Sequence, residues 1–217
     1  FLGAYAAAQL EAGDKALRAV LGAPKGLGAA VGAVVVVVYS MSGGLRASIW
    51  TDAAQAVVML TSMVALLAAA LVAIGGSSAL FVQLAAIEPA LVDPFQADGA
   101  PFFVPWALGW LGAGLGVLGQ PTILVRAMAL RSADEVPRAA VTYFSWFVPF
   151  YAATIALGLC ARVLLPHTRD PEMALPMLAT QLLPDAMVGV MLAGIFAATM
   201  STADSQLLSC SAALVED

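Results

Sequence analysis

The chain has 217 residues, of which 62% are hydrophobic and 11% are charged, and its net charge at pH 7 is −5. Soluble domains carry roughly 25% charged residues, so this composition excludes an ordinary soluble globule. The small, scattered charge gives no reason to expect a nucleic-acid partner, and Cys160 and Cys210 lack the spacing of a metal site or a disulfide framework.

The remaining class is a protein whose outer surface meets lipid, where a spanning helix needs about 20 mostly apolar residues. An open strand in lipid leaves its backbone unpaired, so apolar segments are predicted to be helices, including the valine-rich one. The expected segments are residues 1–20, 27–42, 52–75, 103–128, 139–165 and 185–214. The sequence therefore predicts an all-α integral membrane protein with about six transmembrane helices.

The ends and connections of these segments predict how the chain is organised. Phe1 lies inside an apolar run and Asp217 closely follows another, which indicates the middle of a longer membrane protein. We expect residues 1–217 to form a single transmembrane domain, truncated at both ends. Gly43-Gly44 is predicted to be a turn, and the arginines around the loop of residues 129–140 favour a cytoplasmic position for it.

The fourth segment contains "GWLGAGLGVLGQPTILVR", which is poor material for a continuous helix. Gly119 is followed by Gln120-Pro121, and proline removes a backbone donor and clashes with the preceding turn. Gly112 and Gly116 alone are equally well explained by close packing of helices through small residues. The whole run favours a discontinuous helix, whose unwound backbone offers polar groups to a substrate or ion.

The last segment carries an unusual set of polar residues, in "FAATMSTADSQLLSCSA". Residues three and four apart share a helix face, so Ala198, Ser201, Thr202 and Ser205 form one stripe with Asp204 at its edge. Two hydroxyls beside an accessible carbonyl make an oxygen-rich site for a hard monovalent cation. The alternative is that the hydroxyls bond to carbonyls of their own helix, but a carboxylate inside a span favours function.

A third polar group lies in "SGGLRASIWTDAAQ", where Asp52 and Gln55 are expected to begin the third helix. An acidic residue in a first turn is favoured by the helix dipole. That structural role would account for the presence of Asp52 by itself.

Together these three groups resemble successive motifs of the sodium/solute symporter family. "SGGLRASIWTDAAQ", "GQPTILVRAMALRS" and "GIFAATMSTADSQLLSCSAALVED" occur in the family's order and with similar separations. The second motif is most similar to that of the sodium/proline symporter branch. The resemblance covers essentially the whole chain, and it implies a LeuT-type inverted-repeat fold in which this chain supplies core helices three to eight.

The resemblance also implies site residues. The family's sodium site corresponds to the carbonyl of Ala198 and the hydroxyls of Ser201 and Thr202, and its other ligands lie on the first core helix, outside this chain. A second ion site, present in some members, corresponds to Asp52, Ser201, Asp204 and Ser205. Asp204 stands where some members have a hydroxyl.

For the solute, the resemblance implies an aromatic residue, which corresponds to Tyr5, and positions in the broken helix. These positions correspond to Ala113, Val117, Gln120 and Pro121. The proline branch has Trp and Tyr where this chain has Ala113 and Val117, so the solute pocket is expected to be wider and less aromatic.

The predicted function is sodium-coupled symport of a small organic solute, with proline or another amino acid the best candidate. The expected partners are the solute, the sodium ion and the lipid bilayer, without an obligate protein partner, in a multi-pass bacterial inner-membrane protein. The alternative is the transporter-like sensor of a membrane histidine kinase. An enzyme is not expected, because His167, in a loop, has no nucleophile or metal-ligand spacing around it.

Overall fold

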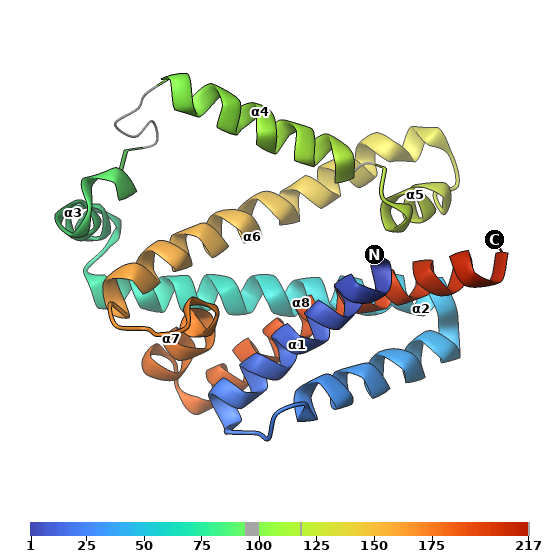
Figure 1. Ribbon diagram of the computed structural model, residues 1–217, viewed down its shortest axis with the longest axis horizontal. Coiled ribbons are helices and arrows are strands. Elements are labelled where there is room, and N and C mark those ends of the chain that lie inside the picture. Colours follow the sequence, from blue (N-terminus) through green and yellow to red (C-terminus); the bar gives the residue numbers. More distant parts are fainter. Residues whose placement is uncertain (94–99, 118, 217) are drawn as a thin grey trace.

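The computed structural model describes residues 1–93, 100–117 and 119–216, and the regular elements within those ranges are all helical. Figure 1 shows the long helices as rods that run roughly side to side across the molecule. The α-helices are α1 (Leu2–Leu21), α2 (Leu27–Ile74), α3 (Ser77–Ile87), α4 (Ala100–Val117), α5 (Pro121–Met128), α6 (Val136–Leu164), α7 (Ala174–Leu182) and α8 (Asp185–Glu216). Three short 3-10 helices, Pro89–Leu91, Ala133–Glu135 and Pro171–Met173, complete them. The all-helical prediction is confirmed for the described residues.

The second and third predicted segments form one helix, α2, which bends at Gly44. This glycine has φ 51° and ψ −143°, a backbone conformation that residues other than glycine rarely adopt. Figure 1 shows the two arms of α2 running in different directions on either side of the bend. The change of direction predicted at Gly43-Gly44 is therefore present, but without the expected separating loop.

By length and composition, α2, α6 and α8 can each cross a membrane within the described residues. The pair Phe103–Val117 and Pro121–Met128, whose axes differ by 52°, makes a fourth span if it is counted as one. This count does not confirm six crossings, in part because α1 carries several charged residues. Along its two arms, the 48 residues of α2 measure about 72 Å, which is more than twice the roughly 30 Å of a bilayer core. The arms are therefore long enough for two crossings, and these two crossings remain a prediction.

The break in the fourth segment falls where the sequence predicts it. Pro121 is the first residue of α5, a position where its missing N–H costs nothing. Gln120 precedes it in an extended conformation. The chain thus changes direction between Val117 and Pro121.

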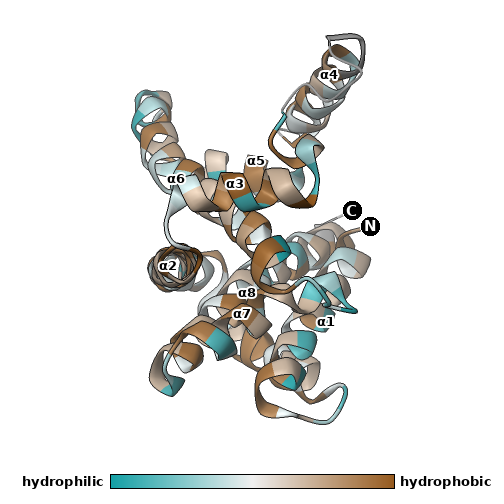
Figure 2. Cartoon of the chain, turned by 90° about the vertical axis from the view of Figure 1, so that its left-hand side faces the viewer, coloured by the Kyte–Doolittle hydropathy of each residue, from teal (hydrophilic) through white to brown (hydrophobic). Residues whose placement is uncertain are grey.

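A packed interior is formed by the inner faces of α2, α3, α6, α7 and α8, around fully buried residues such as Leu66, Leu84 and Leu157. Large apolar side chains also cover the outside, including Val34, Val72 and Leu214. Figure 2, which looks along part of α2, shows this helix hydrophobic around its circumference. A helix that is apolar on all sides requires an apolar environment on its outer face, which lipid provides.

Asp14 holds α1 against the start of α2, a role that the sequence analysis missed. Its buried carboxylate accepts hydrogen bonds from the backbone N–H groups of Gly26, at 3.0 Å, and Gly28, at 2.8 Å, and pairs with Arg18 at 3.0 Å. The carboxylate therefore satisfies N–H groups at the N-terminus of α2 that have no partner within the helix.

Gly28→Ala is expected to destabilise the protein. A Cβ at Gly28 would lie 2.7 Å from the Cα of Asp14, and backbone cannot move aside as a flexible side chain can, so α1 and α2 would have to separate. Overpacking of this kind costs about 1–3 kcal/mol. Thermal unfolding of the full-length protein in detergent should show a lower midpoint. Gly3→Ala is the matched control, since a Cβ there meets nothing within 4 Å; equal midpoints for the two variants would contradict this packing.

Candidate functional site

The stripe of polar residues predicted on the last segment lies on α8, which packs against α1 and α2. The hydroxyls of Ser201 and Thr202 are half-buried and both donate to the carbonyl oxygen of Ala198, each at 3.2 Å. The structure thus brings the three predicted oxygens together on one face of one helix.

These hydrogen bonds are the ones that the structural alternative expects, and they leave the two hydroxyl oxygens able to bind a cation. A hydroxyl has one donor hydrogen and two acceptor lone pairs. When the hydrogens of Ser201 and Thr202 are given to Ala198, the lone pairs of both hydroxyls remain available. The residues present fit part of a sodium shell, and a cation in lipid needs further oxygens from outside this face.

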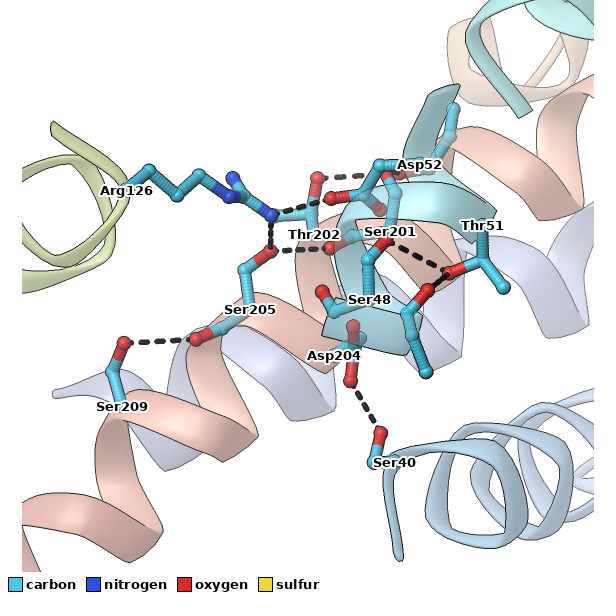
Figure 3. Close-up of polar contacts among 12 residues, drawn as sticks. Ser40, Ser48, Thr51, Asp52, Arg126, Ser201, Thr202, Asp204, Ser205 and Ser209 are labelled. Atoms are coloured by element: carbon cyan, nitrogen blue, oxygen red, sulfur yellow. Dashed lines mark hydrogen bonds and ion pairs between the residues drawn. The ribbon is translucent and has the colours of Figure 1, made fainter. Parts of the chain in front are cut away.

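A charged bridge joins three helices next to this stripe. Arg126, on α5, pairs with the carboxylate of Asp52 on α2, and the same Nη2 group donates to the hydroxyl of Ser205 on α8 at 2.6 Å. Figure 3 shows the guanidinium reaching from α5 to the other two side chains. The Arg126 side chain is 38% exposed and that of Asp52 is 23% exposed. The bridge therefore ties the short half of the broken helix to the two long helices.

Arg126 is a residue of the candidate site that the sequence motifs did not single out. In the sequence, Arg126 is only one of the arginines around the loop of residues 129–140. The signal that could have found it is the unpaired Asp52 inside an apolar span, which requires a cationic partner. Asp52 lies about two turns beyond the bend at Gly44 rather than at the beginning of a helix, so the expected role as a first-turn acid is wrong.

Asp204 belongs to a different group of contacts. Its carboxylate is fully buried and one oxygen accepts from the hydroxyl of Ser40 in the first arm of α2, while the other oxygen, Oδ2, has no hydrogen-bond partner. Figure 3 shows Asp204 pointing toward Ser40, away from Arg126. Of the four residues that the resemblance implies for a second ion site, Asp52 and Ser205 meet through Arg126. Ser201 adjoins Ser205 on α8, where its carbonyl accepts the Ser205 hydroxyl, and Asp204 does not join them.

The predicted solute residues are not gathered in one place. Tyr5 lies on α1 and stacks on Phe1 with ring centroids 6.2 Å apart, whereas Ala113 and Val117 are exposed on α4. Figure 1 shows α4 on the far side of α6 from α1. Gln120 and Pro121 lie at the break before α5. The solute pocket therefore remains a prediction.

The described residues form helices with apolar outer faces, and hydroxyls, carboxylates and a guanidinium meet between α2, α5 and α8. These features define an integral membrane protein with a polar site between its helices. The chain belongs to the sodium:solute symporter family, whose family model matches residues 1–217. This confirms the resemblance found in the three motifs.

Several curated relatives are similar to this chain over most or all of its length. It is 30% identical to the osmoregulated proline transporter OpuE of Bacillus subtilis and 32% identical to a sodium/proline symporter of Staphylococcus aureus, in both cases over 100% of this chain but only 44% and 42% of the relative. A sodium/pantothenate symporter of Haemophilus influenzae is 30% identical over 85% of this chain and 38% of the relative. The chain thus spans less than half the length of these relatives. No solved structure matches it.

Proposed function

We propose that this chain forms the central part of a sodium-coupled symporter, in which an inward sodium gradient drives uptake of a small organic solute by alternating access. The observation that carries the proposal is the convergence of three oxygens from Ala198, Ser201 and Thr202 on α8. Membership of the sodium:solute symporter family supports sodium as the coupling ion. The chain contributes core helices three to eight of a LeuT-type fold in the cell membrane.

Incomplete coordination is the basis of coupling in this proposal. One face of α8 offers two hydroxyls and a carbonyl, so the remaining oxygens come from another helix, the first core helix of the complete protein. Sodium binding is then strong only when the two helices are correctly placed. An ion that binds one conformation better shifts the protein toward that conformation, which links the gradient to the opening and closing of the solute site.

The test is uptake into liposomes that contain the full-length protein. Labelled proline should accumulate when an inward sodium gradient is imposed, and should stop accumulating when sodium outside is replaced by potassium or choline. Accumulation that is equally strong without sodium would reject the proposal.

The topology makes a separate prediction. With core helices three to eight spanning the membrane, the loop of residues 129–140 faces the cytoplasm. A single cysteine introduced as Ser132→Cys in the full-length protein should react with a membrane-impermeant reagent only after the cells are permeabilised. Labelling in intact cells would show that this loop faces outward and would contradict the proposed orientation.

The solute is proposed to be an amino acid or a short carboxylate, with proline the first candidate. Two of the relatives are named as proline transporters or symporters and one as a pantothenate symporter, and proline and pantothenate both carry a carboxylate. Ala113 and Val117 leave room for a solute larger than proline. Competition of labelled proline uptake by a panel of amino acids, carboxylates and sugars should show inhibition by members of the first two classes alone; inhibition by sugars alone would exclude this substrate group.

A further inference from the structure

The residues that correspond to a second ion site are arranged around a guanidinium. The carboxylate of Asp52 pairs with Nη2 of Arg126, and the hydroxyl oxygen of Ser205 accepts from the same nitrogen at 2.6 Å. The Ser205 hydroxyl gives its own hydrogen to the carbonyl oxygen of Ser201 at 2.8 Å, so it meets Arg126 through a lone pair. Figure 3 shows the guanidinium nitrogen between the Asp52 and Ser205 side chains. Two oxygens, one from α2 and one from α8, therefore converge on a point that a positively charged group already holds.

The charges at this point do not favour a sodium ion in addition. The carboxylate of Asp52 and the guanidinium of Arg126 cancel, so the pair has no excess negative charge for a further cation. A sodium ion bound to the same two oxygens would also lie next to the guanidinium, and like charges repel strongly where the dielectric constant is low. The side chains in these positions therefore do not fit a second sodium ion.

Asp204, the remaining acidic residue of this set, does not supply the missing negative charge. Its carboxylate is fully buried and accepts from the hydroxyl of Ser40 in the first arm of α2. Figure 3 shows it pointing toward Ser40 and away from Arg126. The Asp204 charge is thus directed away from the point where the oxygens of Asp52 and Ser205 converge.

We infer that Arg126 is a built-in cation that takes the place of a second sodium ion, and that it thereby sets the number of sodium ions the protein binds. A guanidinium suits this place because its charge is permanent and its N–H groups match carboxylate and hydroxyl oxygens. That a single sodium ion is then carried with each solute molecule rests on the proposed function; the occupation of this point by Arg126 does not.

The number of bound ions tests the inference without transport. The full-length protein in lipid nanodiscs is titrated with labelled sodium in choline buffer until binding is saturated, and the bound ions are counted per protein. Arg126→Ala should bind one ion more than the wild type, because it leaves the Asp52 carboxylate without a cation. Asp52→Ala/Arg126→Ala, which leaves no charge at this point, and the control Arg131→Ala, in the exposed loop, should each match the wild type. Equal counts for Arg126→Ala and the wild type would overturn the inference.

A second measurement serves if Arg126→Ala is too unstable for the count. Arg126→Gln keeps a hydrogen-bond donor near Asp52 but removes the charge. A ligand that binds only the folded state raises the unfolding midpoint, so replacing choline by sodium should raise the midpoint of Arg126→Gln more than that of the wild type. A purely structural role for Arg126 predicts the same rise for both proteins, and that result would also overturn the inference.

Transport then separates this inference from the proposed function. In liposomes that contain the wild-type protein, labelled sodium and labelled proline should enter in an initial ratio of one to one, and two sodium ions per proline would contradict the role of Arg126. Proline entry that needs no sodium would instead remove the proposed function, and the difference in bound ions between Arg126→Ala and the wild type would still decide whether Arg126 takes the place of an ion.

Discussion

Arg126→Ala is expected to lower the stability of the protein more than any other change at the charged bridge. The variant leaves the carboxylate of Asp52 without a cation, while its Oδ1 already has no hydrogen-bond partner. Breaking a fully buried pair costs about 3–5 kcal/mol and an exposed one about 0–1 kcal/mol. With Arg126 38% exposed and Asp52 23% exposed, the expected cost is between these, about 1–3 kcal/mol, which should appear as a fall of several degrees in the unfolding midpoint.

A double-mutant cycle separates the pair from the side chains themselves. Asp52→Ala and Arg126→Ala each leave one charge unpaired, whereas the double variant removes both charges. Residues in one ion-pair network typically show coupling of about 0.5–3 kcal/mol, so the double variant should be clearly more stable than the sum of the single changes. Arg131→Ala, in the exposed loop, controls for loss of an arginine. Additive single effects would mean that Arg126 and Asp52 do not stabilise each other.

Ser201→Ala and Thr202→Ala are each expected to raise the half-saturating sodium concentration for solute uptake about tenfold or more. Each change removes one of the three oxygens that α8 offers, and an unmade polar contact in a buried site costs about 1–3 kcal/mol, where 1.4 kcal/mol is a factor of ten. Thr202→Ser keeps the oxygen, so its effect should be mild. The measurement is uptake against sodium concentration, normalised to the protein present in the membrane.

The matched control for these variants is Thr199→Ala on the same helix. The hydroxyl of Thr199 also bonds to its own backbone, donating to Phe196 at 3.0 Å, but it lies toward Gly13 of α1. Its removal should leave half-saturation within about twofold, because no proposed ligand is lost. If all three alanine variants behave alike, the hydroxyls of Ser201 and Thr202 act only on their own backbone.

Local features of this chain could be predicted from sequence because their causes are local. Apolar length and the cost of unpaired backbone in lipid predict the helices, and the helical repeat places Ala198, Ser201 and Thr202 together. The sequence Gly119-Gln120-Pro121 predicts the break before α5, and Gly43-Gly44 predicts the change of direction in α2. Each of these inferences needs only residues within a few turns of one another.

The contacts between distant segments could not be predicted in the same way. Arg126 and Asp52 are 74 positions apart in the sequence, and only the placement of α5 beside α2 and α8 brings them together. The Asp14 carboxylate caps α2 because the chain reverses after α1, a geometry that the charges within α1 do not reveal. Asp204 is next to Ser205 in sequence, yet it faces Ser40, because adjacent helix residues point in directions about 100° apart.

Labelled sodium entry, measured together with solute entry, tests the central claim most directly. Liposomes with the wild-type full-length protein should take up labelled sodium faster when proline is present, and proline faster when sodium is present. The variant Ser201→Ala/Thr202→Ala should lose both stimulations at sodium concentrations that saturate the wild type. Proline accumulation without accompanying sodium entry, or full stimulation in the double variant, would contradict sodium coupling through α8.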